Sequence, residues 1–90
     1  MNVTIQIPTP LRGYAGKQSE VGVEANTVQE ALKALAQKYH PLKVQLYAED
    51  GRLRAFVNVF LNDDDIRHLG NGATPVKEGD TITIVPSIAG

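Results

Sequence analysis

The stretch TVQEALKALAQKYHP, residues 27–41, decides how this chain folds. Its apolar residues recur at the spacing that places them on one side of an α-helix. Thr27 is suited to cap the helix, and Glu30 three residues later completes a capping box. Pro41 has no N–H to donate and disfavours helical angles at the residue before it, so we expect the helix to stop near Tyr39. The predicted buried stripe contains Val28, Ala31, Leu32, Leu35, Ala36 and Tyr39.

Strand patterns flank this helix on both sides. Residues 3–7 and 21–25 alternate apolar with polar or small side chains, which predicts two strands joined as a hairpin. Residues 55–61 and 81–85 predict two more, and a polar turn at 62–65 leads into a short piece that begins at Ile66. Residues 41–54 are weakly patterned and predict either a short helical turn or an irregular covering segment. The order β-β-α-β-(short β)-β indicates an α+β fold of the β-grasp type, a mixed sheet with one main helix across one face.

Alternation along the strands assigns side chains to the two faces of that sheet. With one helix available, only one face is covered, and we place the alternating aliphatic residues there. This leaves Phe56, Phe60 and Val85 on the open face, where an apolar patch is typical of a partner-docking site. The alternative is that Phe56 and Phe60 pack under residues 41–54. The predicted core face carries Val3, Ile5, Ile7, Val57, Val59, Leu61, Ile82 and Ile84.

Composition narrows the classes of function. The chain has 90 residues, enough for one domain, with 9 basic and 10 acidic side chains and a formal charge of −1. This balance predicts no general affinity for nucleic acid or an anionic membrane. Cysteine is absent, which excludes thiol catalysis and thiolate metal sites and fits a reducing, cytoplasmic setting. We expect a domain over residues 1–86 followed by a flexible tail over residues 87–90.

No combination of side chains predicts catalysis, a metal site or a bound cofactor. Asp63 to Asp65 are consecutive in a turn and lack calcium-loop spacing. His40 and His68 have no third ligand at useful spacing. Gly70-Asn71-Gly72 lacks the lysine of a phosphate loop, and Ser19 and Ser87 lack the partners of a nucleophilic triad. We therefore expect the chain not to be an enzyme.

The last residues, Ile88-Ala89-Gly90, offer one remaining candidate group. The ordinary expectation for such a segment is a frayed end. The alternative is that its α-carboxylate, which is ionised at neutral pH, is the functional group. A carboxylate on a tail of small side chains is able to enter a narrow channel of another enzyme and attack the α-phosphate of a nucleotide.

At this point the chain resembles the MoaD/ThiS sulfur-carrier family of ubiquitin-like β-grasp proteins, and within it the carriers of bacterial cysteine biosynthesis. The similarity spans the whole chain and is weakest from residue 41 to residue 53. The most specific block, GDTITIVPSIAG at 79–90, combines a turn, a strand, a proline and the tail. The other blocks that match are MNVTIQIP at 1–8 and FVNVFLNDDDIR at 56–67.

The resemblance implies a substrate protein acted on by other enzymes. An E1-like adenylyltransferase/sulfurtransferase uses ATP to adenylate the carboxylate of Gly90 and converts it to a thiocarboxylate. A PLP-dependent cysteine synthase then accepts the sulfur, and a JAMM-type metalloprotease trims the product. In that scheme Ile88 and Ala89 thread the partner's channel, and the face around Phe60 docks. The chain itself binds no cofactor.

One departure from the family and three alternative functions stay open. The family ends in Gly-Gly, whereas this chain ends Ala89-Gly90. Either the reactive carboxylate belongs to a further glycine, or the Ala89 methyl slows adenylation, since close backbone approach favours glycine. The alternatives to a cysteine-pathway carrier are the small subunit of molybdopterin synthase, a tRNA-thiolation carrier, and an interaction module in which the open face matters and Gly90 does not.

Overall fold

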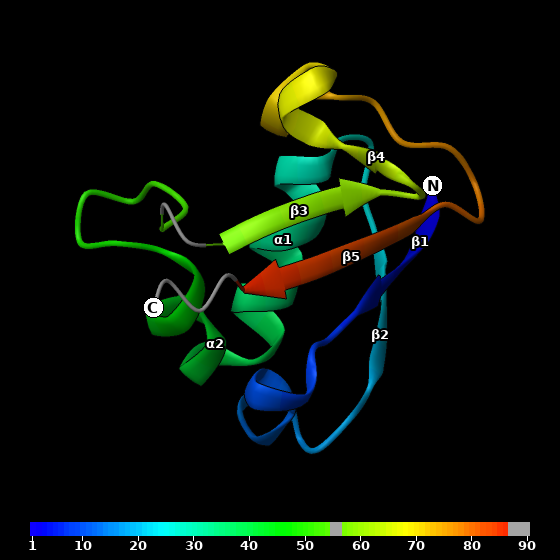
Figure 1. Ribbon diagram of the computed structural model, residues 1–90. Coiled ribbons are helices and arrows are strands. Elements are labelled where there is room, and N and C mark those ends of the chain that lie inside the picture. Colours follow the sequence, from blue (N-terminus) through cyan, green and yellow to red (C-terminus); the bar gives the residue numbers. More distant parts are fainter. Residues whose placement is uncertain (55–56, 87–90) are drawn as a thin grey trace.

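The computed structural model describes residues 1–54 and 57–86 of the chain. Within these residues the sheet strands and helices follow in the order that the sequence predicts, with additional short helical segments (Figure 1). The elements are β1 (Asn2–Gln6), the 3-10 turn η1 (Thr9–Tyr14), β2 (Glu20–Glu24), α1 (Val28–Lys38), α2 (His40–Leu46), β3 (Val57–Leu61), β4 (Asp64–Asp65), the 3-10 turns η2 (Ile66–His68) and η3 (Asn71–Ala73), and β5 (Thr81–Pro86).

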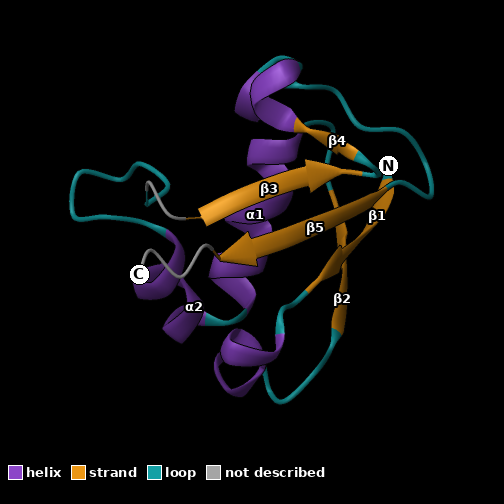
Figure 2. Cartoon of the chain, viewed as in Figure 1, coloured by secondary structure: helices purple, strands orange, loops and turns teal. Residues whose placement is uncertain are grey.

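The strands form one mixed sheet with the order β2-β1-β5-β3-β4. β5 lies in its interior, parallel to β1 and antiparallel to β3, and the hairpin partners β1 and β2 are antiparallel. α1 crosses behind β3 and β5 (Figure 2). This confirms the predicted α+β, β-grasp architecture.

α1 forms for the reasons visible in its sequence. The backbone N–H of Glu30 donates to Thr27 Oγ1 at 3.3 Å, and the Glu30 carboxylate accepts from the N–H of Asn26 at 3.1 Å, one residue before the cap. Five of the six predicted stripe residues are buried, and Tyr39 is half-buried against the core. The helix ends at Lys38, with Tyr39 as the C-cap, as Pro41 predicts.

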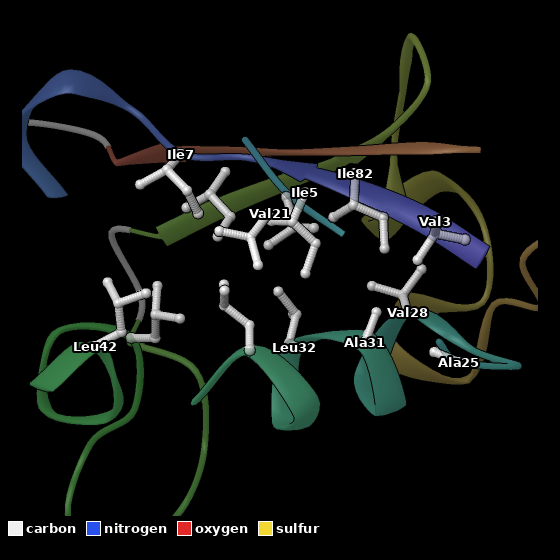
Figure 3. Packing of buried hydrophobic residues seen from close by; sticks show 14 of the residues in the cluster. Val3, Ile5, Ile7, Val21, Ala25, Val28, Ala31, Leu32, Leu42 and Ile82 are labelled. Atoms are coloured by element: carbon white, nitrogen blue, oxygen red, sulfur yellow. The ribbon is translucent and has the colours of Figure 1, made fainter. Parts of the chain in front are cut away.

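Alternation correctly assigned the two faces of the sheet. All eight residues placed against the helix are buried, and Figure 3 shows Val3, Ile5, Ile7 and Ile82 directed toward α1. Asn58 and Phe60, which alternate with buried residues on β3, are half-buried, and Val85 is exposed. Phe60 does not belong to the core cluster, which argues against its packing under residues 41–54.

The prediction of a short helical turn within residues 41–54 is confirmed, and α1 remains the one main helix across the sheet. Residues 40–46 form a second helix, α2, which contacts α1 and η1. Its Leu42 and Leu46 are fully buried in the same core cluster as the strand residues. Pro41 ends α1 but also occupies the first turn of α2, where a missing N–H costs nothing. One proline therefore both stops one helix and starts the next.

The connection between β1 and β2 contains a 3-10 turn that the sequence pattern did not predict. Residues 9–14 form η1, and Leu11 and Ala15 are buried in the core cluster. The prediction missed them because two apolar residues among glycines and prolines show no periodicity. η1 and α2 lie against each other, so they extend the core beyond the end of α1.

Candidate functional site

The predicted tail follows directly on β5, an interior strand of the sheet, and we call the end of β5 at Val85 and Pro86 the root of the tail. β5 is paired on both sides, to β1 through residues 81–83 and to β3 through residues 82–86. Its start is fixed by Asn62, whose N–H donates to the Thr81 carbonyl at 2.7 Å and whose Oδ1 accepts from the Thr81 N–H at 3.1 Å. Strands paired on both edges are the least mobile part of a sheet. The predicted tail residues Ile88, Ala89 and Gly90 lie outside the described residues.

The open face places the other predicted site residues next to one another. Val85 pairs with Asn58 and Phe60 pairs with Thr83, so Phe60 and Val85 are diagonal neighbours on β3 and β5. Diagonal pairs lie within reach of an aromatic side chain. Val85 is 42% exposed. The structure thus brings two of the three predicted docking residues together, and the third, Phe56, lies outside the described residues.

A groove of about 660 Å³ opens beside the end of β5. It forms where the pairing of β1 with β5 ends, at Gln6 and Thr83; the same register continued would bring Pro8 opposite Val85, and Pro8 has no N–H to resume the pairing. β1 leaves β5 there and turns into η1. Sequence reasoning missed this groove, since it depends on the register of two strands far apart in the chain. Its walls include Gln6, Pro8, Arg12, Glu20, Thr83 and Val85.

Two polar contacts stabilise the groove. Arg12 Nε donates to the carbonyl of Ile7 at 3.0 Å, which satisfies a backbone acceptor where β1 ends. Thr83 Oγ1 donates to Gln6 Oε1 at 3.2 Å, linking β5 to β1 across the open face. The groove, the apolar pair (Phe60 and Val85) and the root of the tail therefore lie together at one end of β5.

Asp65 and Arg67 form an ion pair at the far side of β3. Arg67 Nη2 lies 2.7 Å from Asp65 Oδ2, and the Arg67 backbone N–H donates to Asp65 Oδ1 at 2.9 Å. These hydrogen bonds lower the pKa of Asp65 to about 2, so the carboxylate stays ionised in acid that would protonate an ordinary aspartate. Asp63 and Asp64 are exposed and do not share this contact. The run of three aspartates is thus a turn and the short strand β4.

The remaining polar candidates are scattered. His40 begins α2 and His68 ends η2, and both are exposed. Gly70 to Gly72 lie at the start of η3, where Asn71 has a φ of 53°. Ser19 is exposed before β2, and Ser87 lies outside the described residues. Residues 1–54 and 57–86 contain no group of three or more histidines and carboxylates arranged to hold a metal ion.

Within the part of the chain that the structure describes, no helix has the length and apolar character needed to cross a membrane.

Comparison with known proteins matches this fold and sequence to one family. The ThiS family profile matches residues 5–90. The sulfur carrier protein CysO of Mycobacterium tuberculosis is 38% identical over 92 residues, which cover 100% of this chain and 99% of that protein. A chain in the crystal structure of the Amycolatopsis orientalis BexX/CysO complex superimposes with a TM-score of 0.88 and 39% identity, covering 98% of both chains.

The crystal structure of M. tuberculosis CysO superimposes with a TM-score of 0.86 and 35% identity, over 96% of this chain and 99% of that one. The sequence match and the structural superpositions thus extend over nearly the whole chain. The chain belongs to the ThiS family.

Proposed function

We propose that this chain is a sulfur carrier whose reactive group is the C-terminal carboxylate of Gly90. The observation that carries the proposal is the reach of the family match, which includes the final residue, 90. Full-length similarity to the sulfur carrier CysO supports it, as does the position of β5, which ties the root of the tail to two strands. In this proposal the chain is a substrate, and other proteins supply the catalysis.

An E1-like adenylyltransferase/sulfurtransferase converts the carboxylate to a thiocarboxylate in two steps. A carboxylate oxygen of Gly90 attacks the α-phosphorus of ATP, and pyrophosphate leaves, which gives an acyl adenylate. A sulfide equivalent then attacks the acyl carbon and AMP leaves, which gives a thiocarboxylate. ATP is consumed on the partner, and this chain has only to present its terminus and hold the rest of its surface in place.

The tail residues and the open-face residues have different roles in this proposal. We propose that residues 87–90 form a tail separate from the domain of residues 1–86, with Ile88 and Ala89 occupying the partner's channel. Phe60 and Val85, together with Phe56, make the apolar contact that docks the carrier. The support for this contact is its geometry, since two neighbouring apolar side chains stand on an open face at the root of the tail.

The sulfur acceptor that best fits the similarity to CysO is that of cysteine biosynthesis. There, we propose, the thiocarboxylate attacks an activated serine derivative held by a PLP-dependent cysteine synthase, and a JAMM-type metalloprotease releases the product. We place this pathway in the cytoplasm. Molybdopterin synthase and tRNA thiolation use the same thiocarboxylate and would differ only in the acceptor.

Intact-mass spectrometry tests the proposal. The chain is incubated with the E1-like enzyme of its source organism, MgATP and sulfide, both as given and with one glycine added after Gly90. Matched controls lack ATP or lack Gly90. We expect one of the two forms to gain the mass difference between sulfur and oxygen, and only with ATP. If neither form gains it, the chain is not a carrier of this type.

A further inference from the structure

The open face of the sheet carries an uneven distribution of charge. None of the strands β1, β2, β3 and β5 contains a lysine or arginine. The only charged side chains among their outward positions are Glu20 and Glu24, at the two ends of the edge strand β2. The outward positions are Asn2, Thr4, Gln6, Glu20, Gly22, Glu24, Asn58, Phe60, Thr81, Thr83 and Val85.

The register shows how far these charges stand from the apolar pair. Beside Phe60 on β4 lies Asp65, whose carboxylate is paired with Arg67. In the other direction Glu20 pairs with Gln6, Gln6 with Thr83, and Thr83 with Phe60, so one row runs from β2 to β3. Three strand spacings separate its ends by about 14 Å. The face therefore changes from apolar over β3 and β5, through neutral polar groups over β5 and β1, to acidic along β2.

Neither glutamate is neutralised within residues 1–54 and 57–86. The ion pairs found there join Arg52 to Asp50 and Arg67 to Asp65. Arg12 lines the groove together with Glu20, but its Nε hydrogen bonds to the Ile7 carbonyl, and it makes no ion pair with Glu20. Both carboxylates are exposed, so they are available to an incoming partner.

The face is also hollowed beside Glu24. Gly22 stands at the centre of β2, and an open hollow of about 420 Å³ lies over it, with walls that include Asn2, Thr4, Glu24 and Glu78. No heavy atom outside its chain neighbours lies within 4 Å of where a Gly22 Cβ would stand. A long side chain from a partner would fit into this hollow beside the carboxylate.

An interface of ordinary size needs more surface than the apolar pair provides. Specific interfaces bury about 800 Å² on each partner, whereas an aromatic side chain buries about 150–250 Å². A partner that docks on Phe60 and Val85 must therefore extend over neighbouring surface. In the direction away from the tail root, that surface is the polar middle of the sheet and then β2.

We propose that the carrier's docking face extends across the sheet to β2, and that its partner places arginine or lysine side chains against Glu20 and Glu24, one of them in the hollow over Gly22. This inference rests on the proposed function, because it takes the E1-like adenylyltransferase as the partner. With apolar contacts at one side and cationic contacts at the other, only one orientation of the carrier brings the tail root to the partner's active site.

The two halves of the face affect different rate constants. Exposed charges at the rim of an interface accelerate association and are screened by salt, whereas apolar contacts mainly slow dissociation. Loss of the Glu24 charge thus reduces the association rate constant, and filling the hollow over Gly22 raises the dissociation rate constant.

Stopped-flow association of the chain with the source organism's E1-like adenylyltransferase tests this at about 0.02 M and about 0.3 M NaCl. For Glu24→Gln we expect association to slow about threefold at low salt, and for Glu24→Lys about tenfold, with both differences shrinking at high salt. The control Gln37→Lys raises the net charge as much as Glu24→Gln does, but on the exposed side of α1, and should leave the rate unchanged.

Gly22→Val fills the hollow at a strand position that tolerates a side chain, and we expect faster dissociation with unchanged stability. Size-exclusion chromatography checks that each variant elutes at the volume of the unaltered chain, because edge-strand glutamates also prevent aggregation. The salt dependence of the unaltered chain is a test that needs no variant.

If association of the unaltered chain does not slow with salt, or if Glu24→Lys and Gln37→Lys behave alike, the inference is wrong although the carrier function stands. If the unaltered chain neither binds the enzyme nor is adenylated by it, the proposed function and this inference fail together.

Discussion

Ile84 and Val85 are adjacent on β5 but face opposite sides of the sheet, and replacing each by alanine should have opposite consequences. Ile84 is 1% exposed and Val85 is 42% exposed. Ile84→Ala removes three buried carbon atoms, worth about 2.4 kcal/mol in transfer free energy, and leaves a cavity, so we expect the free energy of unfolding to fall by about 3–4 kcal/mol. For a chain of this length that lowers Tm by about 12–30 °C.

Val85→Ala removes two carbon atoms from a side chain that is partly covered already. We expect it to lower the free energy of unfolding by less than about 1 kcal/mol. If a partner covers the exposed 42% of the Val85 side chain, the same substitution weakens the binding free energy by about 0.7 kcal/mol. This corresponds to a loss of about threefold in kcat/KM for adenylation.

Urea unfolding followed by far-ultraviolet circular dichroism measures the stabilities, and carrier-dependent pyrophosphate exchange measures adenylation. The two variants should separate, one unstable and the other stable but slower to be adenylated. Equal destabilisation by both substitutions would refute the assignment of the two faces. A Val85→Ala chain that is adenylated at the full rate would refute the docking role of Val85.

Three further substitutions test the scaffold. Thr27→Ala removes the cap of α1 and should lower the free energy of unfolding by about 1 kcal/mol, whereas Thr27→Ser should retain most of it; equal loss would contradict the capping role. Leu42→Ala should cost about 2–5 kcal/mol by urea unfolding, and a loss under 1 kcal/mol would mean that α2 does not belong to the core. The pKa of Asp65 lies at about 2, below its ordinary 3.8, so its pair with Arg67 stabilises the fold above pH 4 and this contribution disappears as the pH falls through 2. In urea titrations the stability difference between the unaltered chain and Asp65→Asn should therefore narrow from pH 5 to pH 2, and a difference that stays constant would contradict the pairing.

The regular parts of the fold could be predicted because each depends on neighbouring residues. Thr27 and Glu30 mark the start of α1, and alternation separates Val59 from Phe60 without any knowledge of the sheet order. The same alternation placed Val85 on the open face. These are local signals, and the structure confirms them.

The parts that could not be predicted depend on tertiary contacts. The sequence left two alternatives open for residues 41–54, because a helix of seven residues is too short to be stable alone; α2 forms because Leu42 and Leu46 are buried against the rest of the core. The groove depends on the point where the parallel pairing of β1 with β5 ends, with Pro8 in register with Val85, and these strands are more than 70 positions apart in the sequence. The charge pattern did leave a signal, since four strands without a lysine or arginine are visible in the sequence, but only the register shows that Glu20 and Glu24 share the face with Phe60.

The position of the transferred sulfur tests the central claim most directly. Lys77 is the last basic residue, so trypsin releases residues 78–90 as one peptide from a chain treated with the E1-like enzyme, MgATP and sulfide. Tandem mass spectrometry of that peptide, with and without a glycine added after Gly90, should place one sulfur in the final residue. Sulfur found on any other residue, or a peptide left unchanged in both forms, would contradict the account.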